Sequence, residues 1–392
     1  FVIEAGSSLI WNRFATKPEY IFGVNRFTVV IKTAEPYAPL LASLTVPFTA
    51  IVPQHVVEAD EEGFKTAPIG TGPYKLVEWK QGEYTKLEAN PDYFLGEPKT
   101  KNLEMRVVPE ASQRVIAIET GEADLAYGIS ANDSRRVEED SNLQLFKTPS
   151  QSVAYLTLNE NNEKFADKRV RQAIRYAIDK PTIVETMLYG AGEPADSVIP
   201  PNAIGFSDQV VAYEYNIEKA KELMAEAGYE DGFTCTLSVT DDPVKNEICQ
   251  VIQSQLKEIG IECEIQVKEY GTWIDELGTG SHEMSFSGWV CVTGDADYTY
   301  YSLFHSTQVG YAGNDAFLKD DDVDKLVIAA RETADLDERL DYYGQLEVLL
   351  GDLSPYVPLY YESINVGATK NVKNFTADPN GYHRLRNVEV TE

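Results

Sequence analysis

Short stretches of alternating or continuous apolar residues recur along the chain, which predicts β-strands. The clearest lie at 26–32, 74–78, 84–89, 123–127, 153–158, 284–289 and 357–361. Gln81-Gly82 separates the second stretch from the third, so we expect those two strands to form a hairpin.

Longer stretches repeat apolar residues every three to four positions, the spacing of amphipathic helices. The pattern predicts helices from Ser112 to a stop at Gly121 and at 168–179, 217–227, 243–259, 270–277, 323–333 and 336–350. The row Arg169, Arg171 and Arg175 is expected to be a solvated or salt-bridged helix face.

The middle of the chain contains the strand 233–239, the helix 243–259 and the strand 261–267 in succession. A strand, a helix and a second strand in this order predict a right-handed parallel crossover. The mixture of helices and strands places the chain in the α/β class. Its 392 residues exceed the roughly 250 to 300 residues that one core serves, so two lobes are expected.

Composition narrows the possible partners. The formal charge of −29 repels phosphate backbones, so nucleic acid is not an expected partner. The four cysteines form no CxxC pair, and no His stands at ligand spacing, which argues against a metal site or a cofactor. Cys235 and Cys263 are expected on neighbouring strands, where either free thiols or a disulfide is conceivable.

Motifs of enzymes are missing. The sequence contains no GxSxG, HExxH or Walker loop, and Gly70-Thr-Gly-Pro lacks the Lys-Ser/Thr that cradles phosphate. Asp320-Asp-Asp322 lacks the Gly and the closing Glu of a calcium loop. A non-enzymatic protein is therefore expected, with a hydrolase as the weaker alternative.

Several segments together resemble one protein family. They are Gly70-Thr-Gly-Pro-Tyr74, Asn90-Pro-Asp-Tyr-Phe94, Ile118-Glu-Thr-Gly-Glu-Ala-Asp124, Leu158-Asn159 with 167–179, and Gly288-Trp289 through 293–298 to Leu303-Phe304. In this order they are similar to the family 5 extracytoplasmic solute-binding proteins of ABC importers, which include dipeptide, oligopeptide, nickel and glutathione receptors. The resemblance covers nearly the whole chain.

The resemblance implies a two-lobed periplasmic-binding-protein-like α/β fold (type II, cluster C) with mixed sheets and an interlobe cleft. The first lobe would comprise 1–150 plus 362–392, and the second lobe 151–361 would hold the parallel βαβ unit. Family members usually carry a further stretch before the position that matches Phe1. The first lobe is therefore expected to be incomplete at its N-terminus.

The resemblance also implies a function. A monomer would capture a peptide or peptide-like solute outside the cytoplasmic membrane, in the periplasm or lipid-anchored at the cell surface, and deliver it to the membrane permease of an ABC importer. The alternatives are a receptor of the same fold for glutathione, a nickel chelate or another small solute, or a peptide-sensing or adhesion protein.

A peptide receptor needs an acidic group, a basic group and unpaired backbone groups. In the dipeptide-binding relatives an Asp three residues after the motif's Trp pairs with the ligand ammonium, but this sequence has Val292 there. We therefore expect Trp289, Asp295, Asp297 and Tyr298 to contact the ligand, with one of the two acids replacing the missing Asp. A core position for Trp289 and a turn role for Asp295 are the competing interpretations. The spacing 293–298 looks closer to the subgroup with glutathione receptors.

Overall fold

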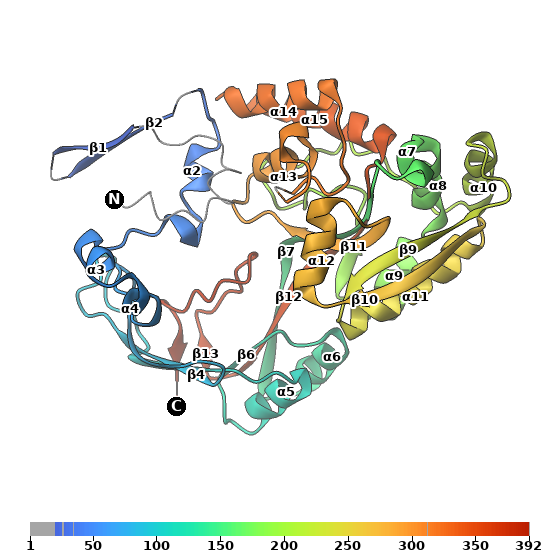
Figure 1. Ribbon diagram of the computed structural model, residues 1–392. Helices are drawn as coiled ribbons and strands as arrows, with labels where there is room; N and C mark the ends of the chain where they lie inside the picture. The colour runs from blue at the N-terminus through green and yellow to red at the C-terminus, as the bar shows by residue number, and fades with distance from the viewer. Residues whose placement is uncertain (1–19, 26, 34, 312, 392) are drawn as a thin grey trace. The chain divides into compact units, whose positions relative to one another are not determined.

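The computed structural model describes residues 20–25, 27–33, 35–311 and 313–391. Its contacts divide the chain into two compact units (Figure 1). The smaller unit contains Val46–Ser150 and Ser363–Glu392, and the larger unit contains Gln151–Glu362 together with the described residues up to Thr45. Strands β7 (Leu143–Leu158) and β12 (Tyr356–Thr369) each run from one unit into the other.

The larger unit is built on a mixed sheet with the strand order β10-β9-β11-β7-β12. Strand β9 (Phe233–Thr240) pairs in parallel with β10 (Ile261–Lys268) along its whole length, with α11 (Pro243–Lys257) between them in sequence. This confirms the predicted crossover unit. Strand β11 (Met284–Val290) runs antiparallel to β7, and the short β8 (Gly192–Pro194) pairs with β12.

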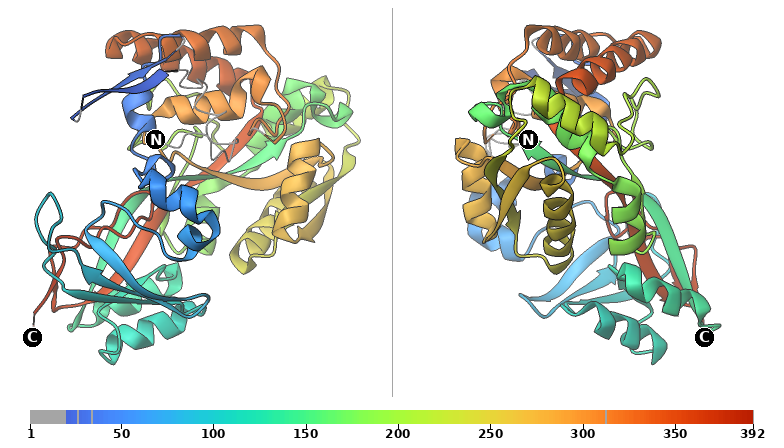
Figure 2. Two further views of the ribbon diagram at one scale, coloured as in Figure 1. Left: turned by 60° about the vertical axis from the view of Figure 1, so that its left-hand side comes forward. Right: turned by 90° about the vertical axis from the view of Figure 1, so that its right-hand side faces the viewer.

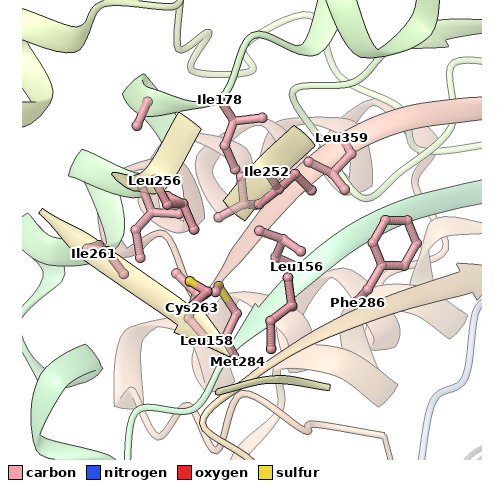
Figure 3. Close-up of a cluster of buried hydrophobic side chains, with 14 of the residues drawn as sticks. Leu156, Leu158, Ile178, Ile252, Leu256, Ile261, Cys263, Met284, Phe286 and Leu359 are labelled. Atoms are coloured by element: carbon pink, nitrogen blue, oxygen red, sulfur yellow. The ribbon is translucent and has the colours of Figure 1, made fainter. Parts of the chain in front are cut away.

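One face of this sheet carries the first hydrophobic core (Figure 3). Leu237 and Val239 of β9 pack there with Ile252 and Leu256 of α11, because alternate strand residues point to the same face. The helices α8 (Lys168–Ala177), α9 (Lys180–Met187) and α10 (Ile217–Glu226) contribute further residues to this core.

The opposite face of β9 is covered by α12 (Tyr270–Thr279). Ser238 donates a hydrogen bond to Glu276 at 3.2 Å, and the indole Nε1 of Trp273 donates to Ser285 of β11 at 2.9 Å. Helices α11 and α12 therefore lie on opposite faces of β9.

A second core in the larger unit is formed by α13 (Ala296–Phe304), α14 (Asp321–Glu332) and α15 (Leu336–Leu353). Helices α14 and α15 lie side by side (Figures 1 and 2). The rings of Tyr300 and Tyr343 stack with their centroids 5.0 Å apart. The remaining elements of this unit are β1 (Tyr20–Asn25), β2 (Thr28–Lys32), α2 (Leu40–Ser43), α7 (Glu163–Ala166) and a 3-10 turn, Ser306–Gln308.

The smaller unit contains an antiparallel sheet of β3 (Tyr74–Lys80), β4 (Tyr84–Ala89) and β5 (Asn102–Arg106), which confirms the predicted hairpin. Strand β6 (Leu125–Tyr127) pairs with β12. The other elements are a 3-10 turn at Pro47–Thr49, α3 (Gln54–Ala59), α4 (Glu61–Thr66), α5 (Ala111–Glu119), α6 (Ala131–Glu139), β13 (Val372–Lys373) and β14 (Glu389–Val390).

The arginine row of α8 is salt-bridged at Arg169, to Asp167, and at Arg171, to Glu160, but the prediction of a solvated face is wrong for two of its members. Arg171 and Arg175 are buried, and Arg171 donates hydrogen bonds to the carbonyl oxygen of Leu353 at 2.6 and 2.9 Å. Arg175 reaches the carbonyl of Gly351 at 3.5 Å. The two guanidinium groups therefore cap the C-terminal end of α15, where carbonyl groups lack helical partners and cations are favourable.

Two further findings concern the described residues. The four cysteines are buried free thiols, and the sulfur atoms of Cys235 and Cys263 lie 3.4 Å apart on directly paired residues of β9 and β10. Within the described part of the chain, every helix is too short or too polar to cross a bilayer.

Candidate ligand-binding site

The sheet of the larger unit opens between β9 and β11. These two strands pair only at Met284 with Leu237 and at Ser285 with Ser238. Strand β11 continues to Val290 with β7 beside it along its whole length. Beyond Phe286, no strand among the described residues pairs with the edge of β11 that faces away from β7, and this edge is called the open edge below.

The backbone groups on this open edge follow from the register. The carbonyl of Glu283 accepts a hydrogen bond from Asn159 at 3.1 Å, and the N–H of Cys291 donates to Gln151 at 2.9 Å, both on the β7 side. Along an antiparallel strand, the backbone N–H and C=O groups of successive residues point alternately to one neighbouring strand and to the other side. The groups of odd-numbered residues from Glu283 to Cys291 point to β7, so the N–H and C=O groups of Gly288 point to the open side. Gly288 is exposed and carries no side chain that would cover them.

A cavity of about 490 Å³ lies at this opening, and the described residues that line it all belong to the larger unit. Its volume falls in the range typical of small-molecule sites. The aromatic part of the wall comprises Tyr155, Tyr270, Trp273, Trp289 and Tyr311, and the polar part includes Ser152, Thr240, Lys245, Ser287, Asp315 and Glu362.

The cavity reaches both faces of the sheet. On β11, Ser287 and Trp289 point to the face that α12 covers, whereas Phe286 points to the α11 face and joins the first core. Lys245 of α11 lies over the ring of Phe286, 5.9 Å from its centroid. An extended chain placed beside β11 would therefore present its side chains alternately to these two walls.

Trp289 forms part of the wall on the α12 side. Its side chain is half-buried, and its ring stacks against Tyr298 with centroids 5.2 Å apart and planes 26° from parallel. Tyr298 is almost fully buried. Tyr298 thus supports Trp289 from behind, and Trp289 supplies the surface that faces the cavity.

The two carboxylates that line the cavity, Glu362 and Asp315, differ in their exposure to solvent. Glu362 is exposed in the cavity and shares a hydrogen bond with Ser152. The surrounding protein raises the pKa of Glu362, mainly by desolvation and further through Asp242, while Lys245 and Ser152 oppose that shift.

Asp315 is buried in the wall. It accepts hydrogen bonds from Tyr356 at 2.8 Å and from Thr157 at 3.3 Å. Burial raises the pKa of Asp315 to about 6 although both hydrogen bonds favour the ionised form.

The two acids expected from the sequence lie in the second core. Asp295 is the N-cap of α13, where it accepts from the N–H of Asp297 at 3.0 Å, and it also accepts from Arg339 at 2.8 Å. Both oxygens of Asp297 accept from Arg331 at 3.0 Å. Asp295 and Asp297 are 4% and 2% exposed, so their carboxylates are occupied by protein. Their contact with a ligand stays a prediction.

Sequence reasoning missed the open edge at Gly288 and the cavity residues Lys245, Asp315 and Glu362. These residues stand far apart in the sequence and belong to no shared motif. The one available signal was the position of Glu362 directly after the predicted strand 357–361. Among the described residues, no cluster of His, Cys, Asp or Glu is suited to hold a metal ion.

Comparison with known proteins identifies the family. The model of the bacterial extracellular solute-binding proteins, family 5, matches residues 5–311. The chain belongs to this family. Family 5 consists of solute-binding proteins rather than enzymes.

Relatives in family 5 include the oligopeptide-binding protein AppA of Bacillus subtilis, 32% identical over 84% of this chain and 65% of AppA. The glutathione-binding protein GsiB of Salmonella choleraesuis is 31% identical over 91% of this chain and 71% of GsiB. The chain thus spans 65% to 71% of the length of these two relatives.

A solved structure of the same family confirms the predicted fold class. The periplasmic binding protein DppA of Helicobacter pylori, in complex with the peptide STSA, superposes with a TM-score of 0.87 at 29% identity. The superposition covers all of this chain and 78% of DppA.

Proposed function

We propose that the protein captures a peptide or peptide-like solute outside the cytoplasmic membrane and delivers it, as a monomer, to the permease of an ABC importer. The observation that carries the proposal is the open edge of β11 at Gly288, which lies in the wall of a cavity with aromatic and charged residues.

An open strand edge suits a peptide ligand. An extended peptide that lies beside β11 can exchange hydrogen bonds with the N–H and C=O groups of Gly288, as in recognition by strand addition. These bonds involve only the main chain of the guest, so they are compatible with many sequences. Trp289 and Trp273 offer apolar surface to its side chains.

The names of relatives support the same class of ligand. AppA is described as oligopeptide-binding, GsiB as glutathione-binding, and the DppA structure holds a peptide. Glutathione is the second candidate for this chain. The observation that favours it is Lys245 in the cavity wall, because glutathione carries two carboxylates and one ammonium group.

The first test is native mass spectrometry of the purified protein, followed by calorimetry with a pool of tri- to pentapeptides of mixed sequence. We expect bound peptide mass or peptide-dependent heat, and recovery of every peptide intact. Binding of glutathione with no response to the peptide pool would replace the first candidate by the second. Absence of both, or steady cleavage of the peptides, would contradict the proposal.

A matched pair of ligands tests the role of β11. Methylation of backbone nitrogens removes N–H donors from the guest and leaves its side chains unchanged. If the guest pairs with β11, affinity for the N-methylated pool falls about 10-fold or more, the scale of one or two lost hydrogen bonds in a desolvated site. Equal affinity for both pools would exclude strand addition.

A further inference from the structure

The geometry points to Glu362 as the group that binds the ammonium of the solute. We propose this role on the basis of the proposed function, since it names the part of a peptide that the cavity recognises. Glu362 stands far in the sequence from Asp295 and Asp297, the two acids expected to contact the ligand.

Glu362 is exposed and lines the cavity. In the register of β12 with β8, it lies opposite Gly192, the first residue of β8. The hydroxyl of Ser152 forms a hydrogen bond with its carboxylate. Ser152 in turn lies opposite Val290, the last residue of β11. The carboxylate is therefore held close to the end of the open edge.

The other acids near the site are already occupied. Asp315, the second carboxylate among the described residues that line the cavity, accepts from Tyr356 and Thr157 and is buried. Asp295 and Asp297 are bound by Arg339 and Arg331. Glu362 is thus the acid with a carboxylate that a guest can approach.

Two charged residues at the N-terminal end of α11 act on Glu362. Lys245 and Asp242 of the α11 N-terminal region act on it with opposite signs, and Ser152 fixes its orientation. Lys245 stands in the same wall, so a free carboxylate of the guest has a cation within the same cavity. An ammonium group that leaves water must find a charged acceptor, because burial of an unpaired charge is costly.

The test compares free peptides with peptides that are acetylated at the amino end. The wild-type protein is titrated by calorimetry with both forms of the tri- to pentapeptide pool. We expect acetylation to weaken binding about 10- to 100-fold, as for loss of a charge-assisted hydrogen bond. Glu362→Gln should weaken binding of the free pool to a similar extent and leave the acetylated pool nearly unaffected.

Two variants complete the design. Ser152→Ala should produce a smaller loss, since it removes only the hydrogen bond that orients Glu362. Glu264→Gln, an exposed acid of β10, is the control and should bind as the wild type does. Thermal unfolding of each variant checks that the fold is retained, and the acetylated pool provides a test on unmodified protein should Glu362→Gln fail to fold.

The outcomes separate this inference from the proposed function. If free and acetylated pools bind the wild type equally, or Glu362→Gln binds the free pool with full affinity, Glu362 does not bind the ammonium, while peptide capture stands. If neither pool binds at all, the proposed function fails and the role of Glu362 fails with it.

Discussion

The guanidinium of Arg331 donates one hydrogen bond to each carboxylate oxygen of Asp297, both 3.0 Å long, inside the second core of the larger unit. Removal of one partner leaves a buried charge uncompensated. Arg331→Met should therefore lower the free energy of unfolding by about 3 to 5 kcal/mol, measured by urea denaturation.

The double variant Arg331→Met/Asp297→Leu is the informative control for this pair. It removes both charges, so it should be more stable than Arg331→Met alone. The exposed pair Lys325–Asp322, 2.8 Å apart, gives the surface reference, and Lys325→Ala should change stability little. A double variant less stable than Arg331→Met would contradict the argument that the uncompensated charge of Asp297 causes the loss of stability.

Trp289→Ala tests the aromatic wall. The substitution removes the ring that faces the cavity and leaves Tyr298 behind it. Affinity for the peptide pool should fall about 10-fold or more, since large aromatic residues often dominate binding. Trp79→Ala, an exposed tryptophan of β3 in the smaller unit, is the matched control. Unchanged calorimetric affinity of Trp289→Ala would restrict this residue to a packing role.

The raised pKa of Asp315 leads us to expect that the stability of the protein depends on pH. Its pKa in the folded protein, about 6, lies above the ordinary value of 3.8, so the folded state binds the proton more tightly than the unfolded state. The contribution of Asp315 is fully present below pH 3.8 and is lost as the pH rises through about 6.

The measurement compares the wild type with Asp315→Asn between pH 4 and pH 7. The stability of the wild type relative to the variant should fall by about 2 kcal/mol over this interval. Asp231→Asn, an exposed acid, should leave the difference constant. A difference that rises with pH would mean that the carboxylate is stabilised in its ionised form.

Glu362 predicts a dependence of binding on pH. An ammonium ion binds the ionised carboxylate, and the pKa of Glu362 is raised, chiefly by desolvation and also by Asp242, against the effects of Lys245 and Ser152. Affinity for free peptides should therefore decrease on acidification, starting at a higher pH than for an ordinary Glu. Calorimetric titrations across this range should show the decrease in the wild type and a weaker one in Glu362→Gln.

Much of the fold could be predicted because its elements are amphipathic. The crossover from β9 through α11 to β10 has polar and apolar faces that the sequence makes visible. Helix α13 has no such pattern, since it is buried on nearly all sides, and no helix was predicted there. Without a polar face, a short helix gives no periodic signal.

The site was predicted less completely than the fold. Trp289, which lines the cavity, was singled out because it stands in a motif, whereas Glu362 and Ser152 come together only through strand neighbours far apart in sequence. The end of pairing between β9 and β11 depends on how strands separate in three dimensions. The roles of charged residues were also difficult to predict. Arg171 and Asp297 are buried and hydrogen-bonded within the protein, and the sequence alone does not reveal these partners.

The open edge of β11 has a consequence for how ligand specificity can evolve. If the main chain of the sheet binds the main chain of the peptide, one protein can bind peptides of many different sequences. Substitutions at exposed residues of α12, such as Tyr270 and Ile274, can then change which peptides bind best without any change in the strands below them.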